Sequence, residues 1–94
     1  MKIEDVVKEG RRPGGTRARV LEYLNERPDE VFRMRDSKKV AEVLDVPPRT
    51  AEHCFWSLAH DGLIAKARFD GRVWYGSHAA IEALTSLHPD AVLL

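Results

Sequence analysis

The 94-residue sequence predicts a single α+β domain that is mostly helical, and three observations support this prediction. Apolar residues recur at helical spacing in several stretches, which predicts amphipathic helices. After Gly62 the spacing changes to that of strands, and Asp70-Gly71 between two such runs is a strong hairpin signal. A hydrophobic fraction of 44% beside 32% charged residues is typical of one globular domain.

The first third of the chain predicts two helices and a short strand. Residues 3–7 carry a thin apolar stripe, and the glycine- and proline-containing run at 10–15 interrupts it. A second helix is expected to begin at Thr16, whose hydroxyl can cap it. Residues 31–34 alternate apolar and basic side chains, which predicts a short strand. The buried face of the second helix is expected to comprise Ala18, Val20, Leu21 and Leu24.

Two further helices are expected on either side of a tight turn. Asp36 or Ser37 can cap the first of them. Pro48 suits the first position of the second helix, where a missing N–H costs nothing, and Gly62 suits a left-handed stop. The apolar positions expected to face the core are Val40, Ala41, Val43, Leu44, Ala51, Phe55 and Leu58.

A β-hairpin and a last helix complete the prediction. Residues 63–69 and 72–75 predict its strands, and Gly71 accepts the positive φ of a type I′ turn. Alternation along the second strand places only one of Trp74 and Tyr75 on the core. Ser77 can cap the last helix, whose apolar side would comprise Ala80, Ile81, Leu84 and Leu87.

Helix, short strand, helix, turn, helix and hairpin follow in the order of a winged helix-turn-helix domain. Residues 40–50, VAEVLDVPPRT, and residues 55–64, FWSLAHDGLI, resemble two signatures of bacterial and archaeal winged-helix transcriptional regulators. The Trp74-Tyr75 pair is similar to the end of their second wing strand. This chain has Asp45 where many members have glycine, and Pro47 where many have a capping serine.

The resemblance implies one domain over residues 1–94, with a three-helix core and a β-hairpin wing at 16–77. An N-terminal helix and basic arm at 1–15 and a C-terminal helix at 78–94 would flank this core. The resemblance also implies sequence-specific or semi-specific binding of double-stranded DNA by a transcriptional regulator. The helix after the turn would enter the major groove, and the wing would lie on the backbone or in the minor groove.

Three groups of side chains are the expected DNA contacts. On the recognition helix they are the outward polar residues Arg49, Thr50, His53 and Ser57. On the wing they are the cations Lys66, Arg68 and Arg72. In the basic arm and at the helix ends they are Arg11, Arg12, Arg17, Lys38 and Lys39. Two alternatives stay open, since Thr50 can simply stabilise the first helical turn and the arm can be a solvated linker.

The charge of the chain is polarised although its formal net value is +0. Residues 10–21, residues 66–72 and the Lys38-Lys39 pair together carry a net charge of +8, so the rest carries −8. Such an arrangement can hold a polyanion on one face. The neutral total instead favours a rival class, the winged-helix module that binds protein in a multi-subunit assembly.

The sequence predicts no enzymatic activity, cofactor or metal site. It lacks a glycine-rich phosphate loop, a nucleophile–base–acid set and paired carboxylates. His53 and Cys54 are adjacent, so on a helix their side chains point about 100° apart and cannot form a pair. The one cysteine suits a reducing cytoplasm. No stretch approaches the ~20 apolar residues of a membrane span.

The terminal segments predict a homodimer. Ile81, Leu84 and Leu87 form an apolar stripe outside the expected core, and Ile3, Val6 and Val7 form another in the N-terminal segment. Exposed apolar patches usually mark an interface. The alternative is that the last helix folds back onto the first core helix of the same chain. Trp56 is left open between a buried position and an exposed anchor for a partner.

Overall fold

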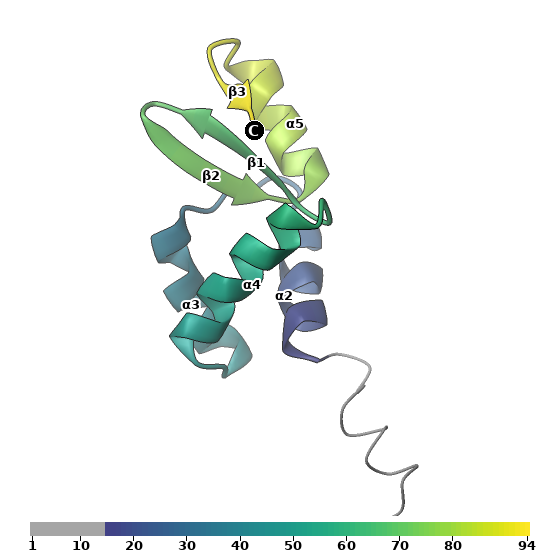
Figure 1. Cartoon of the computed structure of the whole chain (residues 1–94). Coiled ribbons are helices and arrows are strands. Elements are labelled where there is room, and N and C mark those ends of the chain that lie inside the picture. Colours follow the sequence, from purple (N-terminus) through teal and green to yellow (C-terminus); the bar gives the residue numbers. More distant parts are fainter. Residues whose placement is uncertain (1–14) are drawn as a thin grey trace, which may run out of the picture.

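The computed structural model describes residues 15–94, which form an α+β fold that is mostly helical (Figure 1). This coarse prediction is confirmed. The described residues hold four α-helices, one 3-10 turn and one antiparallel sheet of three strands. Their bounds are α2 Thr16–Asn25, η1 Met34–Asp36, α3 Ser37–Leu44, α4 Pro48–His60, β1 Ala65–Phe69, β2 Arg72–Gly76, α5 His78–Leu87 and β3 Val92–Leu93. The helix predicted at 1–9 and the arginines of the basic arm lie outside the described residues.

The turn between α3 and α4 is only three residues long, because the residues at its two ends tolerate the backbone conformations that it requires. Asp45 follows α3 with φ 55°, a left-handed conformation that aspartate tolerates better than most residues. The amide of Val46 donates to the carbonyl of Ala41 at 2.9 Å and closes the helix. Pro48 occupies the start of α4, as predicted. Gly62 adopts φ 76° after α4, which confirms the left-handed stop.

Side-chain capping of a helix N-terminus follows the prediction only at α5. The Ser77 hydroxyl accepts a hydrogen bond from the amide of Ala80 at 3.1 Å. Thr16 is instead the first residue of α2 after Gly15, and no side chain caps that helix, so this prediction was wrong. The cap predicted at Asp36 or Ser37 was also wrong. The Asp36 carboxylate accepts from the backbone N–H of Arg33 at 2.9 Å and closes η1 rather than α3.

Replacing Ser77 with alanine is expected to lower the free energy of unfolding by about 1 kcal/mol, the usual cost of losing such a cap. The hydroxyl is buried, so the freed amide of Ala80 would have no water to replace it. Denaturant unfolding monitored by circular dichroism measures this change. Ser86→Ala, on the exposed side of the same helix, is the control and should change stability little.

The sheet joins segments that are distant in the sequence. β1 and β2 form an antiparallel hairpin through Asp70 (φ 55°) and Gly71 (φ 70°), the two positive values that a type I′ turn needs. β1 begins at Ala65 rather than 63, because the amides of Leu63 and Ile64 still bond to the Leu58 carbonyl and close α4. β3 pairs with the other edge of β1 and was not predicted.

The strand predicted at 31–34 is reduced to one bridging residue. Phe32 and Tyr75 exchange two backbone hydrogen bonds of 2.7 and 2.6 Å. The chain then turns into η1 at Met34, because the Asp36 carboxylate closes a capping box with Arg33. The prediction was therefore right about pairing at this position and wrong about length.

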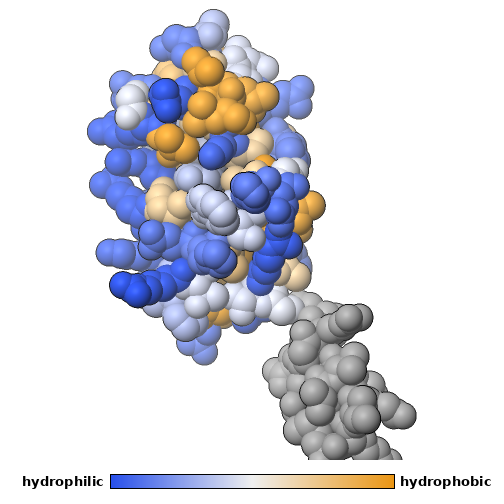
Figure 2. Space-filling view, viewed as in Figure 1, coloured by the Kyte–Doolittle hydropathy of each residue, from blue (hydrophilic) through white to orange (hydrophobic). Residues whose placement is uncertain are grey.

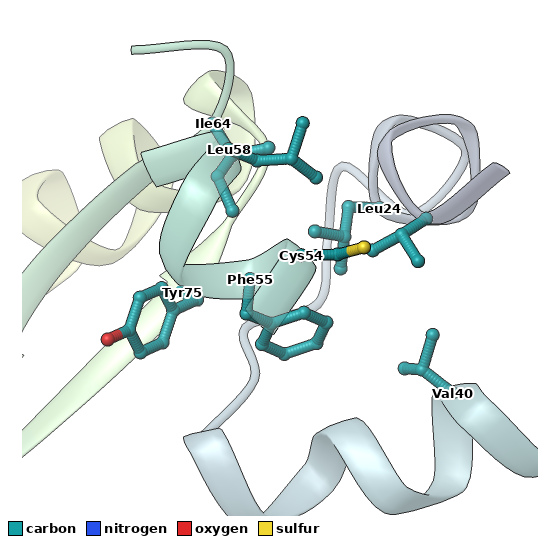
Figure 3. Close-up of a cluster of buried hydrophobic side chains, with 8 residues drawn as sticks. Leu24, Val40, Cys54, Phe55, Leu58, Ile64 and Tyr75 are labelled. Atoms are coloured by element: carbon teal, nitrogen blue, oxygen red, sulfur yellow. The ribbon is translucent and has the colours of Figure 1, made fainter. Parts of the chain in front are cut away.

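The core lies between the α2–α4 helices and one face of the sheet (Figure 3). The Phe55 ring is its centre, edge-to-face with Phe32 at 6.2 Å and tilted against Tyr75 at 5.9 Å. Gly76 faces the other side of the sheet, where its Cα lies beside Ala80 and Ile81 of α5. The described part of the chain thus has three layers, with the sheet between α2–α4 and α5. The large side chains that are fully buried in this fold include Val20, Leu24, Val40, Phe55, Leu58, Ile64 and Ile81.

Two apolar positions predicted to be buried, Ala18 and Val43, are instead exposed, whereas Leu87 was predicted as part of an apolar surface for a second copy. Ala18 faces solvent on α2. Val43 is 57% exposed, because the short α3 turns only Val40 and Ala41 fully toward α4. Leu87 is 77% exposed, because it lies at the end of α5 beyond the sheet. No helix within residues 15–94 combines the length and apolarity that a bilayer crossing requires.

Two buried acids make the fold sensitive to alkali. Burial raises the pKa of the Cys54 thiol above its ordinary 9.0, although Arg17 acts in the opposite direction. Burial also raises the pKa of Tyr75 above 10.0. Each group is neutral in the fold and costs free energy when it ionises there, so its contribution is intact below the unfolded-state pKa and is lost as the pH rises through the folded-state value.

We therefore expect the free energy of unfolding to fall above pH 9, where Cys54 would already ionise in the unfolded chain. Denaturant titrations at a series of pH values measure this decline. In Cys54→Ala the part that begins near pH 9 should disappear, which leaves the later part due to Tyr75. An identical decline in the variant would contradict the assignment to Cys54.

Candidate nucleic-acid interface

Helix α4 has one buried and one exposed face. Ala51, Cys54, Phe55 and Leu58 are buried, which confirms the three predicted inward positions and adds Cys54. On the other face an open concavity of about 540 Å³ reaches from α4 to Met34 of η1. The α4 residues that line it are Arg49, Glu52, His53 and Trp56. An exposed face of mixed polar and aromatic side chains on a well-packed helix is suited to recognition.

The aromatic part of this face is a stack of three rings along α4. The indole of Trp56 lies 5.0 Å from the ring of His60, with an interplanar angle of 7°. His53 lies on the preceding turn, 6.0 Å from the indole at 25°. Trp56 is 52% exposed, which answers the question that the sequence left open about its burial. The stack gives α4 a stiff apolar ridge between two imidazoles that can donate or accept hydrogen bonds.

Two of the predicted DNA contacts are engaged with each other. The Arg17 guanidinium of α2 donates to the Ser57 hydroxyl at 3.2 Å and forms an ion pair with Asp61. Thr50 is half-buried at the start of α4, where its amide bonds to the Pro47 carbonyl. The freely presented members of the predicted α4 set are therefore Arg49 and His53.

The hairpin cations do not form one patch. In the register of the hairpin, Lys66 and Arg68 share the face of Tyr75, whereas Arg72 flanks the turn on the alternate set of positions. Arg72 forms an ion pair with Asp70 at 3.3 Å. Arg68 is exposed and Lys66 is half-buried. The sequence predicted all three as one group, and the structure divides them between two sides of the sheet.

Two cations that the sequence analysis did not select lie next to Arg72. Arg33 and Arg35, from the segment that crosses into η1, line a concavity of about 290 Å³ together with Arg72. Met34 lines both this concavity and the one on α4, so the two adjoin. The signal in the sequence was the basic alternation at 31–35, which was used only to predict a strand.

The surroundings of the Arg33 guanidinium disfavour its charged form. Loss of hydration is the main cause that lowers the pKa of this group, the Arg35 and Arg72 charges lower it further, and Asp36 raises it. Repulsion among three like charges is thus a smaller part of the pKa shift, and one carboxylate opposes it.

The remaining predicted cations lie away from this corner or outside the described residues. Lys38 and Lys39 are exposed in the first turn of α3. Lys39 lines a separate concavity of about 350 Å³ with Tyr23 and Glu30. Arg11 and Arg12 lie outside the described residues.

The residues that could suggest catalysis or metal binding do not converge. His53 is exposed and Cys54 is buried, so the two lie on different faces of α4. Within residues 15–94 no group of three or more His, Cys, Asp or Glu side chains is arranged to hold a metal ion.

The predicted dimer surface needs one correction. Ile81 is 1% exposed, because it packs against the sheet of its own chain, and it is not available to a partner. The alternative, in which this helix folds back onto α2, also differs from the structure, since α5 packs on β1 and β2. Leu84 is half-buried, and the N-terminal segment lies outside the described residues. Figure 2 shows hydrophobic atoms gathered toward the α5 and β3 end, where the exposed apolar residues are Leu87, Val92, Leu93 and Leu94.

Comparison of the chain with family models, curated proteins and solved structures gave no match.

Proposed function

We propose that the chain is a winged helix-turn-helix protein that binds double-stranded DNA and regulates transcription. In this proposal α3, the turn at 45–47 and α4 are the helix-turn-helix, and the β1–β2 hairpin is the wing. The order of the elements, the three-residue turn and the single bridge between Phe32 and Tyr75 support it. The α4 helix would enter the major groove, which is wide enough to admit a helix.

The observation that carries the proposal is the position of the exposed face of α4 beside a cluster of arginines. Arg49 and His53 on α4 present donors suited to base edges, and Arg49 can form a bidentate pair with guanine. Arg33, Arg35 and Arg72 lie just beyond Met34, where a backbone running along the groove edge would pass. Two adjoining parts of one surface would thereby contact the bases and the phosphates of the DNA.

The polarised charge supports this division of roles. Arg49 and Glu52 cancel on α4, so that helix by itself attracts phosphates weakly. The attraction would come from the arginines beside it, from Arg68, and from Lys38 and Lys39 at the start of α3. A protein with zero net charge can bind DNA through a local cluster of cations such as Arg33, Arg35 and Arg72.

A homodimer belongs to the proposal. The exposed apolar side chains at the end of α5 and in β3 offer a surface for a second copy, with Leu87 and Leu93 the most exposed of them. Pairing through this end would present two α4 helices to successive major grooves about one helical turn apart. Sedimentation equilibrium of wild type and Leu87→Glu tests whether the two copies meet here.

One observation favours the rival function of a protein-binding module. Trp56 is large, half-exposed and in the middle of the same α4 face. Tryptophan in such a position is common at the centre of protein interfaces. We prefer DNA as the ligand because an apolar protein interface would not require the neighbouring arginine cluster, whereas DNA phosphates would pair with it.

Titration of labelled duplexes at several salt concentrations tests the proposal. We expect binding to random duplex that weakens with salt at a log–log slope of about −4 to −5 per subunit, as for roughly 4–6 neutralised phosphates. A duplex from the upstream region of the chain's own gene is the specific arm. No binding at low salt, or a slope near zero, would reject DNA and favour the protein-binding module.

A further inference from the structure

The concavity between η1 and the tip of the hairpin brings together three arginines from two segments. Its volume is about 290 Å³, and three of its lining side chains are Arg33, Arg35 and Arg72. Two of these come from the segment before α3, and the third comes from the strand after the turn at Asp70-Gly71. The concavity thus joins two elements that are separated by nearly forty positions in the chain.

The carboxylates near this concavity do not neutralise it. Asp70 pairs with Arg72 at 3.3 Å, and Asp36 is engaged with the backbone N–H of Arg33. Within the described residues, neither the Arg33 nor the Arg35 guanidinium has a carboxylate oxygen within 4.0 Å. Three cations therefore meet two acids, and only one of these acids forms an ion pair with a lining arginine.

The side-chain type indicates what would relieve this repulsion. Guanidinium groups present planar pairs of N–H donors that match the oxygens of a phosphate, often in bidentate fashion. The Arg33 guanidinium also lies 6.0 Å from the centroid of the Trp74 ring, which limits its freedom before any ligand arrives. Gly71 leaves open space beside the cluster, because a Cβ added there would meet no atom within 4 Å.

We propose that Arg33, Arg35 and Arg72 form a binding site for one phosphate group. The phosphate can be a diester of the DNA backbone, in which case the inference rests on the proposed function, or it can belong to a free phosphorylated small molecule. In either case a bound phosphate ties the hairpin tip to η1. The site would add a specific anchor, and it includes two arginines that were not among the DNA contacts predicted from the sequence.

NMR of the arginine side chains tests the site directly in the full chain. Inorganic phosphate is expected to shift the Nε–Hε signals of Arg33, Arg35 and Arg72 in a saturable way. The signal of Arg27, which pairs with Glu26 and Glu30 in the segment after α2, is the internal control and should remain in place. A short random duplex forms the second arm of the experiment.

The double variant Arg33→Gln/Arg35→Gln separates the two sources of phosphate. If the site holds a DNA phosphate, duplex affinity should fall by about 10-fold and the salt slope should flatten by about one unit. The matched control is Arg19→Gln/Arg27→Gln, which removes the same charge from α2 and the segment that follows it. If inorganic phosphate shifts the three arginines and both double variants bind duplex equally well, the site serves a free phosphate.

The proposal is overturned if inorganic phosphate shifts none of the three signals in the wild type and the two double variants lose the same duplex affinity. The wild-type titration keeps this test valid even if a variant does not fold. Absence of duplex binding by the wild type would reject the proposed function alone. The phosphate arm would then still decide whether the site exists.

Discussion

Phe55→Ala is expected to lower the free energy of unfolding by about 3–5 kcal/mol, the range for removing a buried phenylalanine. The Phe55 side chain is 0% exposed and contacts the rings of Phe32 and Tyr75, so the substitution leaves a cavity where α4 meets the sheet. A domain of this size has about 5–15 kcal/mol of total stability. The variant should therefore lose a large share of its stability and unfold at a clearly lower temperature and denaturant concentration than the wild type.

Thermal and denaturant unfolding followed by circular dichroism measures this loss. Trp56→Ala, one position further along α4, is the matched control, since its side chain is half-exposed and packs mainly on two imidazoles. The control should cost about 1 kcal/mol or less. Equal losses in the two variants would mean that the burial pattern assigned to α4 is wrong.

Arg49→Glu is expected to lower duplex affinity by about 100-fold or more while the fold is unchanged. Arg49 is exposed on α4 and makes no ion pair among the described residues, so its removal costs the core nothing. Loss of one bidentate base contact is worth about 1–3 kcal/mol, and the new carboxylate adds repulsion from the phosphates. Fluorescence anisotropy on a specific duplex measures the change.

A control variant with the same change in net charge distinguishes the loss of the Arg49 contact from a general effect of charge on DNA binding. Ala83→Glu/Ser86→Glu adds two negative charges to the exposed side of α5, across the sheet from α4. It should weaken binding only slightly, because exposed charges beyond a Debye length are largely screened. If this double variant and Arg49→Glu weaken binding equally, α4 is not the contacting element.

The features of the fold that the sequence predicted are those decided by local backbone chemistry. Pro48, Gly62 and the Asp70-Gly71 turn each have few alternatives, and the structure has them where expected. β3 was missed because its two residues are held only by pairing with β1, which local sequence does not encode. Val43 was misjudged because helical spacing indicates the apolar side of α3 but not how narrow its contact with α4 is.

The candidate site was predicted less completely, since it depends on contacts between distant segments. The outward positions of Arg49 and His53 followed from the opposite placement of Phe55 on one helix. The pairing of Arg17 with Ser57 spans forty positions and has no local signature. Arg35 was overlooked because its importance comes from Arg72, which only the folded hairpin brings near it.

The contrast between the two tryptophans gives this molecule a pair of internal optical reporters. Trp56 lies half in solvent between imidazoles on α4, so its emission should respond to anything that covers that face. Trp74 is half-buried on β2, and its indole N–H donates to the Phe69 carbonyl at 3.1 Å across the hairpin. Its emission should change when the hairpin opens. With one tryptophan replaced by phenylalanine at a time, occupancy of α4 and integrity of the hairpin could be followed separately and without a dye.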